Sequence, residues 1–285
     1  MRKFLTAAMA AFAVLAVAGL AYAANEYTVD GGTKPRGKGK ATKPLPVSLS
    51  FDYTVADENP ANRGTPVEKY FIGAEGLVTY PEEFPNCPYS TPTGGGANAQ
   101  DVTVAKRDCR RARVGGGIIK AYAGPAQDQT VKLNCVLELN LYNLKPGNYG
   151  TRGRVTKKHG ALGIRIDAVQ ASIPNLNDEH KGKCATAQNE AILAPYKPVR
   201  IKGVKADVLQ FTVPQSLLHP AGLDTVVQFV ESAVKKKVAR KRIKGKQRRV
   251  GFYSAVGCKG RQRSIQVTFI SETGQRTPVT KNKPC

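Results

Sequence analysis

The residues with the clearest chemical potential are basic, and they gather near the end of the chain. Residues 235–263 include 13 Lys and Arg side chains and no acidic one. A dense run of one charge attracts polyanions such as phosphate or sulfate polymers. The alternative is that these charges only protect exposed strand edges from aggregation. We take ten of them as candidate anion-binding residues: Lys235, Lys236, Lys237, Arg240, Lys241, Arg242, Lys244, Lys246, Arg248 and Arg249.

Patterns for catalysis are nearly absent from the sequence. A hydrolytic triad would have to use one of only three histidines, His159, His180 and His219. The sequence has no nucleophile elbow of the G-x-S-x-G type, no H-E-x-x-H zinc motif and no phosphate-binding G-x-x-x-x-G-K-[ST] loop. His219 lies in a Leu-His-Pro-Ala-Gly block that is more typical of a turn. We therefore predict no enzyme activity and no cofactor.

Two small clusters of carboxylates need separate consideration. Glu82 and Glu83 are adjacent, and adjacent residues of a strand point to opposite faces, whereas glycoside cleavage needs two carboxyl groups held across a cleft. Asp178, Glu179 and His180 lie in a polar stretch that is typical of a solvated loop. Neither cluster predicts a metal or catalytic site.

The N-terminus predicts export. Residues 1–3 are a short basic segment, residues 4–20 are apolar, and Ala21-Tyr22-Ala23 fits a signal-peptidase site. The apolar run is about three residues short of the roughly twenty that span a membrane. We expect a signal peptide over residues 1–23, cleavage near Ala23, no transmembrane segment in the mature chain, and a protein that is secreted or associated with the cell envelope.

Six cysteines follow this signal, and outside the cytoplasm an even number predicts a disulfide framework. They are Cys87, Cys109, Cys135, Cys184, Cys258 and Cys285. Fifteen connectivities are possible. If strands on either side of Gly274 pair, Cys285 returns close to Cys258. Cys87 and Cys109 flank a Gly-rich loop, which leaves Cys135 with Cys184.

The remaining sequence predicts a basic arm followed by one domain. Residues 24–46 are rich in Gly, Pro and Lys and predict a flexible, disordered basic arm. Residues 47–285 predict a single all-β domain, an antiparallel β-sandwich-like fold stapled by disulfides. Apolar residues alternate at 47–55 and 131–141. Further strands are expected at 69–72, 118–122, 162–169, 205–213, 249–256, 265–271 and 276–281.

The segment 223–238 fits either a helical face or a strand. Its valine content favours a strand that forms a basic hairpin with the segment near 249–256, over about residues 225–256, closed at Gly245.

Gly115, Gly116 and Gly117 follow three arginines and fit either an anion-binding backbone nest or, more commonly, a bulge or bend.

Several sequence blocks resemble those of uncharacterised secreted bacterial proteins of similar length. The resemblance implies export and a disulfide-bonded, β-rich body, and it brings no activity or catalytic residue. The blocks are Phe84-Pro-Asn-Cys-Pro88, Cys109-Arg-Arg-Ala-Arg-Val-Gly-Gly-Gly117, Ala123-Gly-Pro125, Phe211-Thr-Val-Pro214 with Leu217-Leu-His-Pro-Ala-Gly222, and residues 48–53 and 253–258.

Charge is the main indicator of function. The chain has a net charge of +23, and residues 199–285 carry 19 basic against 4 acidic side chains. The sequence therefore favours a non-enzymatic protein of the cell envelope that binds an anionic cell-wall polymer, polysaccharide or lipid headgroups. Sequence-specific nucleic-acid binding is not expected, since the chain has no Trp and few aromatic residues among the charges. The alternative is a structural or partner-binding β-domain whose charge is incidental.

Overall fold

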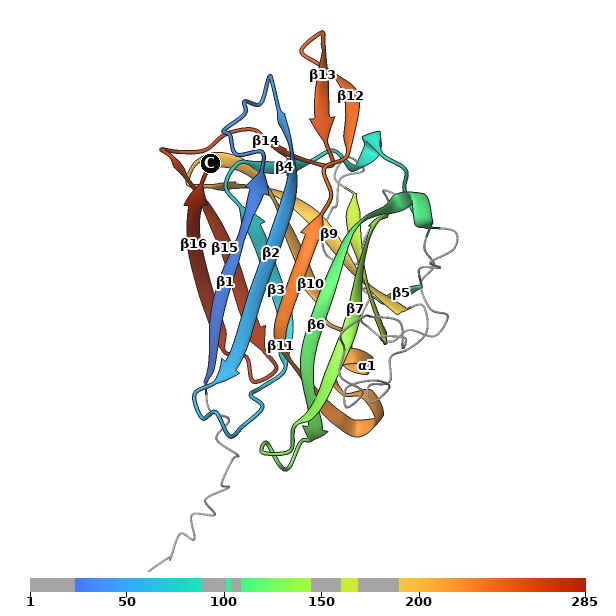
Figure 1. Ribbon diagram of the computed structural model, residues 1–285, viewed down its shortest axis with the longest axis vertical. Coiled ribbons are helices and arrows are strands. Elements are labelled where there is room, and N and C mark those ends of the chain that lie inside the picture. The colour runs from blue at the N-terminus through green and yellow to red at the C-terminus, as the bar shows by residue number, and fades with distance from the viewer. Residues whose placement is uncertain (1–23, 89–100, 104–108, 145–159, 169–189) are drawn as a thin grey trace, which may run out of the picture.

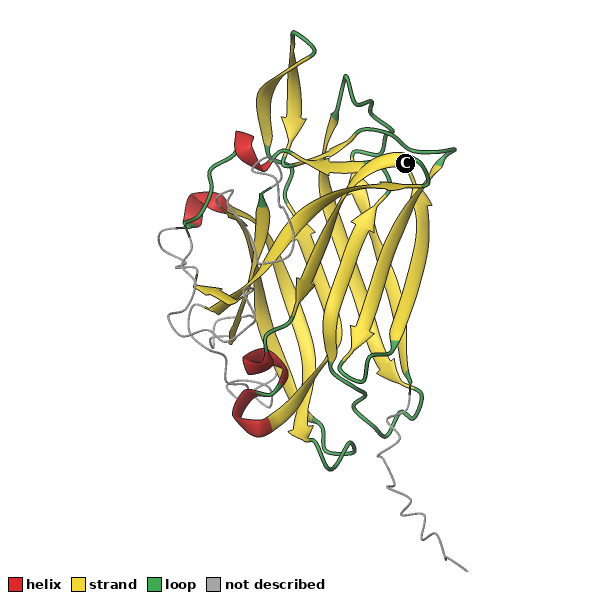
Figure 2. Cartoon of the chain, turned by 180° about the vertical axis from the view of Figure 1, so that it is seen from behind, coloured by secondary structure: helices red, strands yellow, loops and turns green. Residues whose placement is uncertain are grey.

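The structure is a computed structural model, and it describes residues 24–88, 101–103, 109–144, 160–168 and 190–285. Strands make up most of these residues (Figures 1 and 2). The helices are short: α1 (Gln215–Leu218) and the 3₁₀ turns η1 (Pro81–Glu83), η2 (Arg110–Ala112) and η4 (Pro220–Gly222). All strand pairs are antiparallel over this part of the chain, so the predicted all-β, antiparallel class is confirmed.

Most strands belong to one continuous sheet, which has 14 strands among the described residues. In order across the sheet they are β16 (Arg276–Pro284), β15 (Gln262–Ser271), β3 (Val67–Ala74), β10 (Val204–Thr212), β9 (Glu190–Ile201), β8 (Ala161–Ala168), β7 (Leu133–Leu144), β6 (Arg113–Pro125), β11 (Leu223–Val234) and β2 (Leu45–Asp57). Strand β1 (Asn25–Lys34) pairs with β2. The short strands β14 (Tyr253–Ala255) and β4 (Leu77–Thr79) extend one end of β2, and β5 (Asp101–Thr103) pairs with β9.

The sheet curls until its two outer strands, β1 and β16, lie side by side (Figure 1). Asp30 Oδ1 of β1 lies 2.5 Å from Lys283 Nζ of β16, and the Tyr27 ring stacks on Phe269 of β15 with centroids 4.2 Å apart. The two walls of the curl enclose the main apolar core. The predicted sandwich is therefore not confirmed, because hydrogen bonding joins the strands into one curled sheet.

Alternation of side chains explains why the strands bury one face. In β2, Val47, Tyr53 and Val55 are buried in the core, while Leu49 and Phe51 pack against it. The residues between them are Ser, Asp and Thr, which face away from the core. The strand predicted at 47–55 is thus confirmed, with the predicted face buried.

Residues 24–46 were predicted to be a disordered arm, and this is wrong. β1 pairs with β2 along its whole length, from Asn25 opposite Asp57 to Lys34 opposite Ser48. The pairing is possible because Gly31 has no side chain: a Cβ there would lie 2.6 Å from the backbone oxygen of Ser50. Residues 35–44 form a loop that is also held, since Gly39 makes a β-bridge with Val256.

The basic hairpin exists but is shorter than predicted. Residues 223–234 are a strand, as favoured, but this strand is β11, which pairs with β2 and β6 in the large sheet. Its Val226, Val230 and Val234 are buried. An apolar face of that length is stable only where it packs against the core, which a projecting hairpin would not allow. The separate hairpin consists of β12 (Val238–Ile243) and β13 (Lys246–Gly251). It closes at Lys244-Gly245, which both have positive φ, as a tight two-residue turn requires.

Two of the predicted disulfides are present, Cys87–Cys109 and Cys258–Cys285. Cys135 is disulfide-bonded and buried, as expected. Its predicted partner Cys184 lies outside the described residues.

The glycines at 115–117 form part of β6, beside a register shift between Arg113 and Gly115, which fits the bulge interpretation.

Some predictions fall on residues that the structure does not describe. These are the signal peptide at 1–23, the cluster at 178–180, and the histidines His159 and His180. Among the helices that are described, none has the length and apolar content needed to cross a membrane.

The bridge between Cys258 and Cys285 joins the segment before β15 to the end of the outer strand β16, so it should stabilise the sheet where it closes. Replacing both cysteines, Cys258→Ala with Cys285→Ala, should lower the free energy of unfolding by about 2–5 kcal/mol, because the unfolded chain gains freedom. Denaturant unfolding measures the change. The matched pair Cys87→Ala with Cys109→Ala opens a loop of similar length, 22 against 27 residues, and should cost a similar amount. An unchanged midpoint in both variants would contradict a stabilising role.

Candidate functional site

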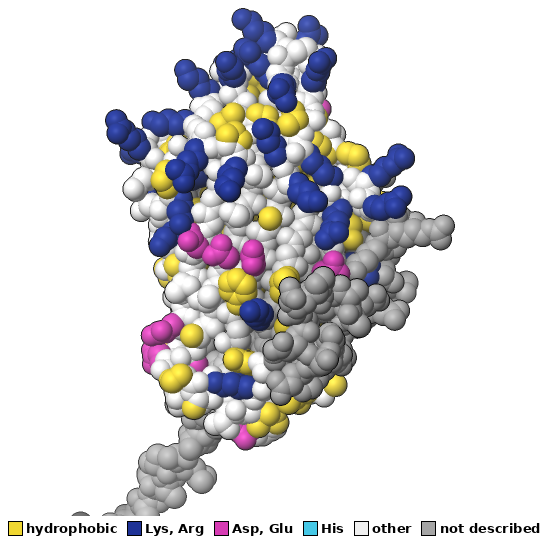
Figure 3. Space-filling view, in the orientation of Figure 1, with side chains coloured by type: hydrophobic (Ala, Val, Ile, Leu, Met, Phe, Trp, Pro, Cys, Tyr) yellow, Lys and Arg dark blue, Asp and Glu magenta, His cyan; other side chains and the backbone are white. Residues whose placement is uncertain are grey.

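Exposed Lys and Arg side chains from distant parts of the sequence gather at one end of the molecule, here called the basic end. Figure 3 shows them covering the upper part of one face, around the projecting hairpin that is labelled in Figure 1. We define the basic end by five described segments: residues 34–43, from the end of β1 into the β1–β2 loop; residues 110–113; residues 200–205, around the β9–β10 turn; the hairpin region 235–249; and residues 259–261.

Specific contacts hold these segments together. The β-bridge between Gly39 and Val256 joins the β1–β2 loop to the chain that follows the hairpin. Arg263, which is buried, donates from Nη2 to the Gly37 oxygen at 3.3 Å. Lys237 Nζ donates to the Arg113 oxygen at 2.6 Å. The basic segments therefore form one folded surface rather than separate flexible tails.

The ten predicted anion-binding residues all lie at this end, but they are not equivalent. Three are only partly exposed: Lys237, Lys241 and Arg248. The other seven are exposed: Lys235, Lys236, Arg240, Arg242, Lys244, Lys246 and Arg249. At the end of β1 and in the β1–β2 loop, Lys34, Arg36, Lys38, Lys40 and Lys43 are exposed as well.

Lys241 attaches the hairpin to the body of the protein. Its Nζ contacts Glu82 Oε1, lies 2.8 Å from Glu83 Oε1, and sits 5.3 Å from the centre of the Tyr80 ring. Burial alone would lower the pKa of Lys241, but the two carboxylates outweigh burial and raise it. The expectation that Glu82 and Glu83 point apart was wrong, because they lie in the 3₁₀ turn η1 and not in a strand.

Lys237 has a second anchoring role at the base of the hairpin. Its ammonium donates to the backbone oxygens of Arg111, at 3.3 Å, and Arg113. Burial, with a smaller effect from the charge of Lys235, lowers the pKa of Lys237. Lys237 and Lys241 thus hold the hairpin in place, and the exposed side chains around them remain available to a partner.

A shallow cleft of about 600 Å³ lies at the basic end, between the β1–β2 loop, the β9–β10 pair and the hairpin. Ala41, Arg200, Lys205 and Lys241 contribute to its walls, together with Tyr80. Glu82 also lines it, and its carboxylate is engaged by Lys241. The cleft thus brings an aromatic ring and several cations together around one open space.

No known family, curated protein or solved structure matches this chain. The resemblance of its sequence blocks to uncharacterised secreted bacterial proteins therefore stays a prediction. Any functional assignment has to come from the chain's own residues.

A row of acidic side chains bounds the basic end on the outer face of the sheet. Asp30 of β1 lies opposite Asp52 of β2, and Asp52 lies opposite Glu231 of β11. Burial, followed by the negative charges of Asp30 and Glu231, raises the pKa of Asp52.

Among the described residues, no group of three or more metal-binding side chains is positioned to hold a metal ion.

The sequence patterns missed a polar cluster at the opposite end of the molecule. His219 lies between two carboxylates: Nδ1 is 2.9 Å from Asp224 Oδ1, and Nε2 is 2.6 Å from Glu272 Oε1. Burial alone would lower the pKa of His219, but Glu272 and Asp224 outweigh burial and raise it. Because a carboxylate occupies each ring nitrogen, the imidazole is not free to activate a nucleophile. The arrangement favours a structural clasp, and only His219 itself was visible as a signal in the sequence.

Arg63 extends this cluster into the protein. Its side chain is fully buried, and Nη2 lies 3.5 Å from Asp224 Oδ2. The guanidinium also donates to the backbone oxygens of Asp128 at 2.6 Å, Val131 at 3.0 Å and Pro125 at 2.5 Å. These bonds fix the loop between β6 and β7 against the start of β11.

The His219 clasp predicts a pH dependence of stability. The pKa of His219 is raised in the folded state, so its contribution is complete below the unfolded value, near 6.5, and is lost as the pH rises through the folded value. Between pH 6 and pH 9 the wild-type protein should lose about 0.5–1 kcal/mol of stability that the neutral variant His219→Gln does not lose. Denaturant unfolding at several pH values measures this difference. The other two histidines are common to both proteins, so parallel curves would contradict the clasp.

Proposed function

We propose that this protein is a secreted, non-enzymatic protein of the cell envelope that binds an anionic polymer or surface through its basic end. One observation carries the proposal: the fold gathers the basic hairpin, the basic β1–β2 loop and three further basic segments on one surface. A field of one sign over a continuous surface attracts polyanions and speeds their encounter. The partner would be an anionic cell-wall polymer, a polysaccharide or lipid headgroups.

Edge protection alone does not account for the charge. Lysines on the free edges of the β12–β13 hairpin would discourage it from pairing with other chains. However, Lys38, Lys40 and Lys43 lie on the β1–β2 loop, and Lys259 and Arg261 lie in the connection before β15. These five positions lie outside the main ladders of the sheet, so protection of an edge does not require their charge.

The exposed side chains also suit a partner that is read by charge rather than by sequence. Most of them are long and exposed, so they can follow a polymer of variable shape. Lys237 and Lys241, which hold the hairpin, keep its charges projecting from the body. Binding of this kind releases counterions and therefore weakens steeply as salt rises.

The test compares two variants that remove the same number of charges. The first replaces four exposed hairpin residues: Arg240→Gln, Arg242→Gln, Lys244→Gln and Lys246→Gln. The second replaces four basic residues outside the basic end: Lys69→Gln, Lys120→Gln, Lys132→Gln and Arg276→Gln. Retention of each protein on isolated cell envelopes and on immobilised heparin is measured over a salt series.

The hairpin variant should bind more weakly, and its plot of log affinity against log salt should be less steep by about 3, since each of the four lost contacts contributes about 0.7–0.9 to the slope. The control variant should follow the wild type. Equal losses in both variants would show that only net charge matters and would contradict a site at the basic end. Salt-independent retention would instead favour a protein partner held by another face.

A further inference from the structure

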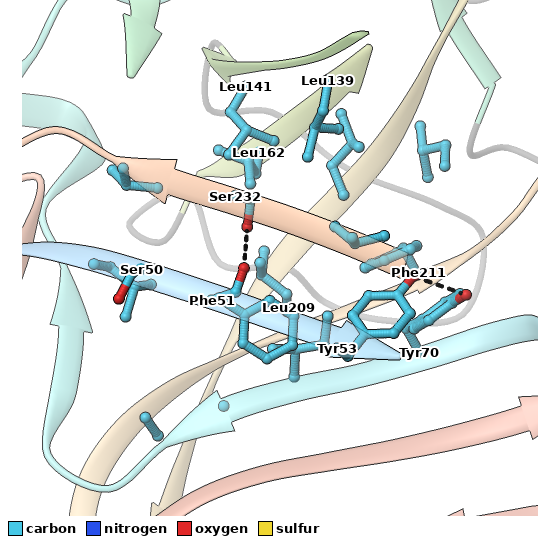
Figure 4. Close-up of a pocket in the computed structure, with 18 of the residues that line it drawn as sticks. Ser50, Phe51, Tyr53, Tyr70, Leu139, Leu141, Leu162, Leu209, Phe211 and Ser232 are labelled. Carbon is cyan, nitrogen blue, oxygen red and sulfur yellow. Dashed lines mark hydrogen bonds between the residues drawn. The ribbon is translucent and has the colours of Figure 1, made fainter. Parts of the chain in front are cut away.

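The two walls of the curled sheet leave more space between them than their side chains fill. A cavity of about 160 Å³ lies between the two walls of the curl, and Figure 4 shows the residues around it. Protein interiors normally pack with few voids larger than a water molecule. A space of this size is therefore a feature that needs an explanation.

Apolar side chains from both walls line the cavity. Leu139 and Leu141 of β7 and Leu162 of β8 lie on one side, and Leu209 and Phe211 of β10 lie on another (Figure 4). Several interior residues of this lining, among them Ile72, Ile164 and Leu209, keep accessible surface. Their packing is incomplete where they meet the cavity.

The polar groups at the cavity are few, and protein partners engage them. The Tyr53 hydroxyl donates to the Tyr70 hydroxyl at 3.1 Å, and burial raises the pKa of both tyrosines, so both stay neutral. Ser232 Oγ donates to the Phe51 oxygen at 2.9 Å (Figure 4). At the border of the cavity, Asp207 Oδ2 accepts from the backbone N and the hydroxyl of Thr79. An anionic ligand would find no cation among the described residues of this lining, and the Asp207 carboxylate at its border already accepts two hydrogen bonds from Thr79.

We propose that this cavity binds a small, uncharged and mainly apolar ligand, of about the size of one aromatic ring or a short alkyl chain. Water gains little in a cavity with so few free polar partners. An apolar cavity of about 150 Å³ lined by Leu, Ile and Phe stays dry and takes up benzene or xenon, and the volume and lining here are comparable. The Tyr70 hydroxyl accepts the bond from Tyr53, so its own proton can serve a ligand that carries one oxygen acceptor. This site is independent of the basic end.

The first measurement uses the wild-type protein with benzene as the probe. Benzene in about tenfold excess over its dissociation constant should raise the unfolding temperature by about 2–4 °C. Methyl NMR under xenon pressure locates the site, and the methyl signals of Leu139, Leu141 and Leu162 should shift more than those of Leu133, which is exposed. If neither benzene nor xenon has an effect on these signals or on the unfolding temperature, the proposal is wrong.

Variants that fill the cavity give the second measurement. Ile164→Phe and Leu209→Phe add bulk to the lining and should abolish the response to benzene. Val238→Phe adds bulk on the exposed hairpin and should leave the response intact. A benzene response that persists in both folded filling variants would place the ligand elsewhere and overturn the proposal. If the filling variants do not fold, the xenon shifts of the wild type decide.

Discussion

The rest of the structure depends on the contact between the two outer strands of the sheet, β1 and β16. An open sheet of this length would leave two edges with unpaired backbone groups, which attract other chains. Here Lys283 pairs with Asp30 across the meeting strands, and Tyr27 stacks on Phe269 just inside them. The closure also explains why β1 is folded. Without β1, the strand β2 and the aromatic residues next to β2 would face solvent.

Closure has two consequences for function. The connections between antiparallel strands must emerge at the two ends of the curl, so basic loops that are far apart in sequence meet at one end. The curl also sets the distance between its walls, and at the centre the side chains are too short to fill that distance. The basic end and the apolar cavity thus arise from the same geometry, although they suit ligands of opposite chemistry.

The sequence predicted well wherever one physical signal dominated. Alternation of apolar residues revealed β2 and β7, and the spacing of Cys258 and Cys285 about Gly274 predicted a real bridge. Prediction from the sequence failed where tertiary contacts override local composition. Residues 24–46 contain so many Gly and Lys residues that they resembled a disordered arm. Pro195 and Pro198 concealed the strand β9, in which both prolines are accommodated.

In the candidate site, the ten basic residues were found from charge density alone. The roles of Lys237 and Lys241 as anchors, and the His219 clasp, depend on residues distant in sequence and left no local pattern.

The separation of charge along the molecule has a consequence for orientation. The basic end carries most of the exposed positive charge of the described residues, and Figure 3 shows acidic side chains below it on the same face. Asp30, Asp52 and Glu231 form a row across neighbouring strands. Such a distribution contributes an electric dipole that points toward the basic end. Near any negatively charged plane, this dipole exerts a torque that turns the hairpin toward the plane before contact. Bound molecules would then stand upright on the plane, and the surface area available to each would be set by the narrow cross-section of the curl rather than by its length.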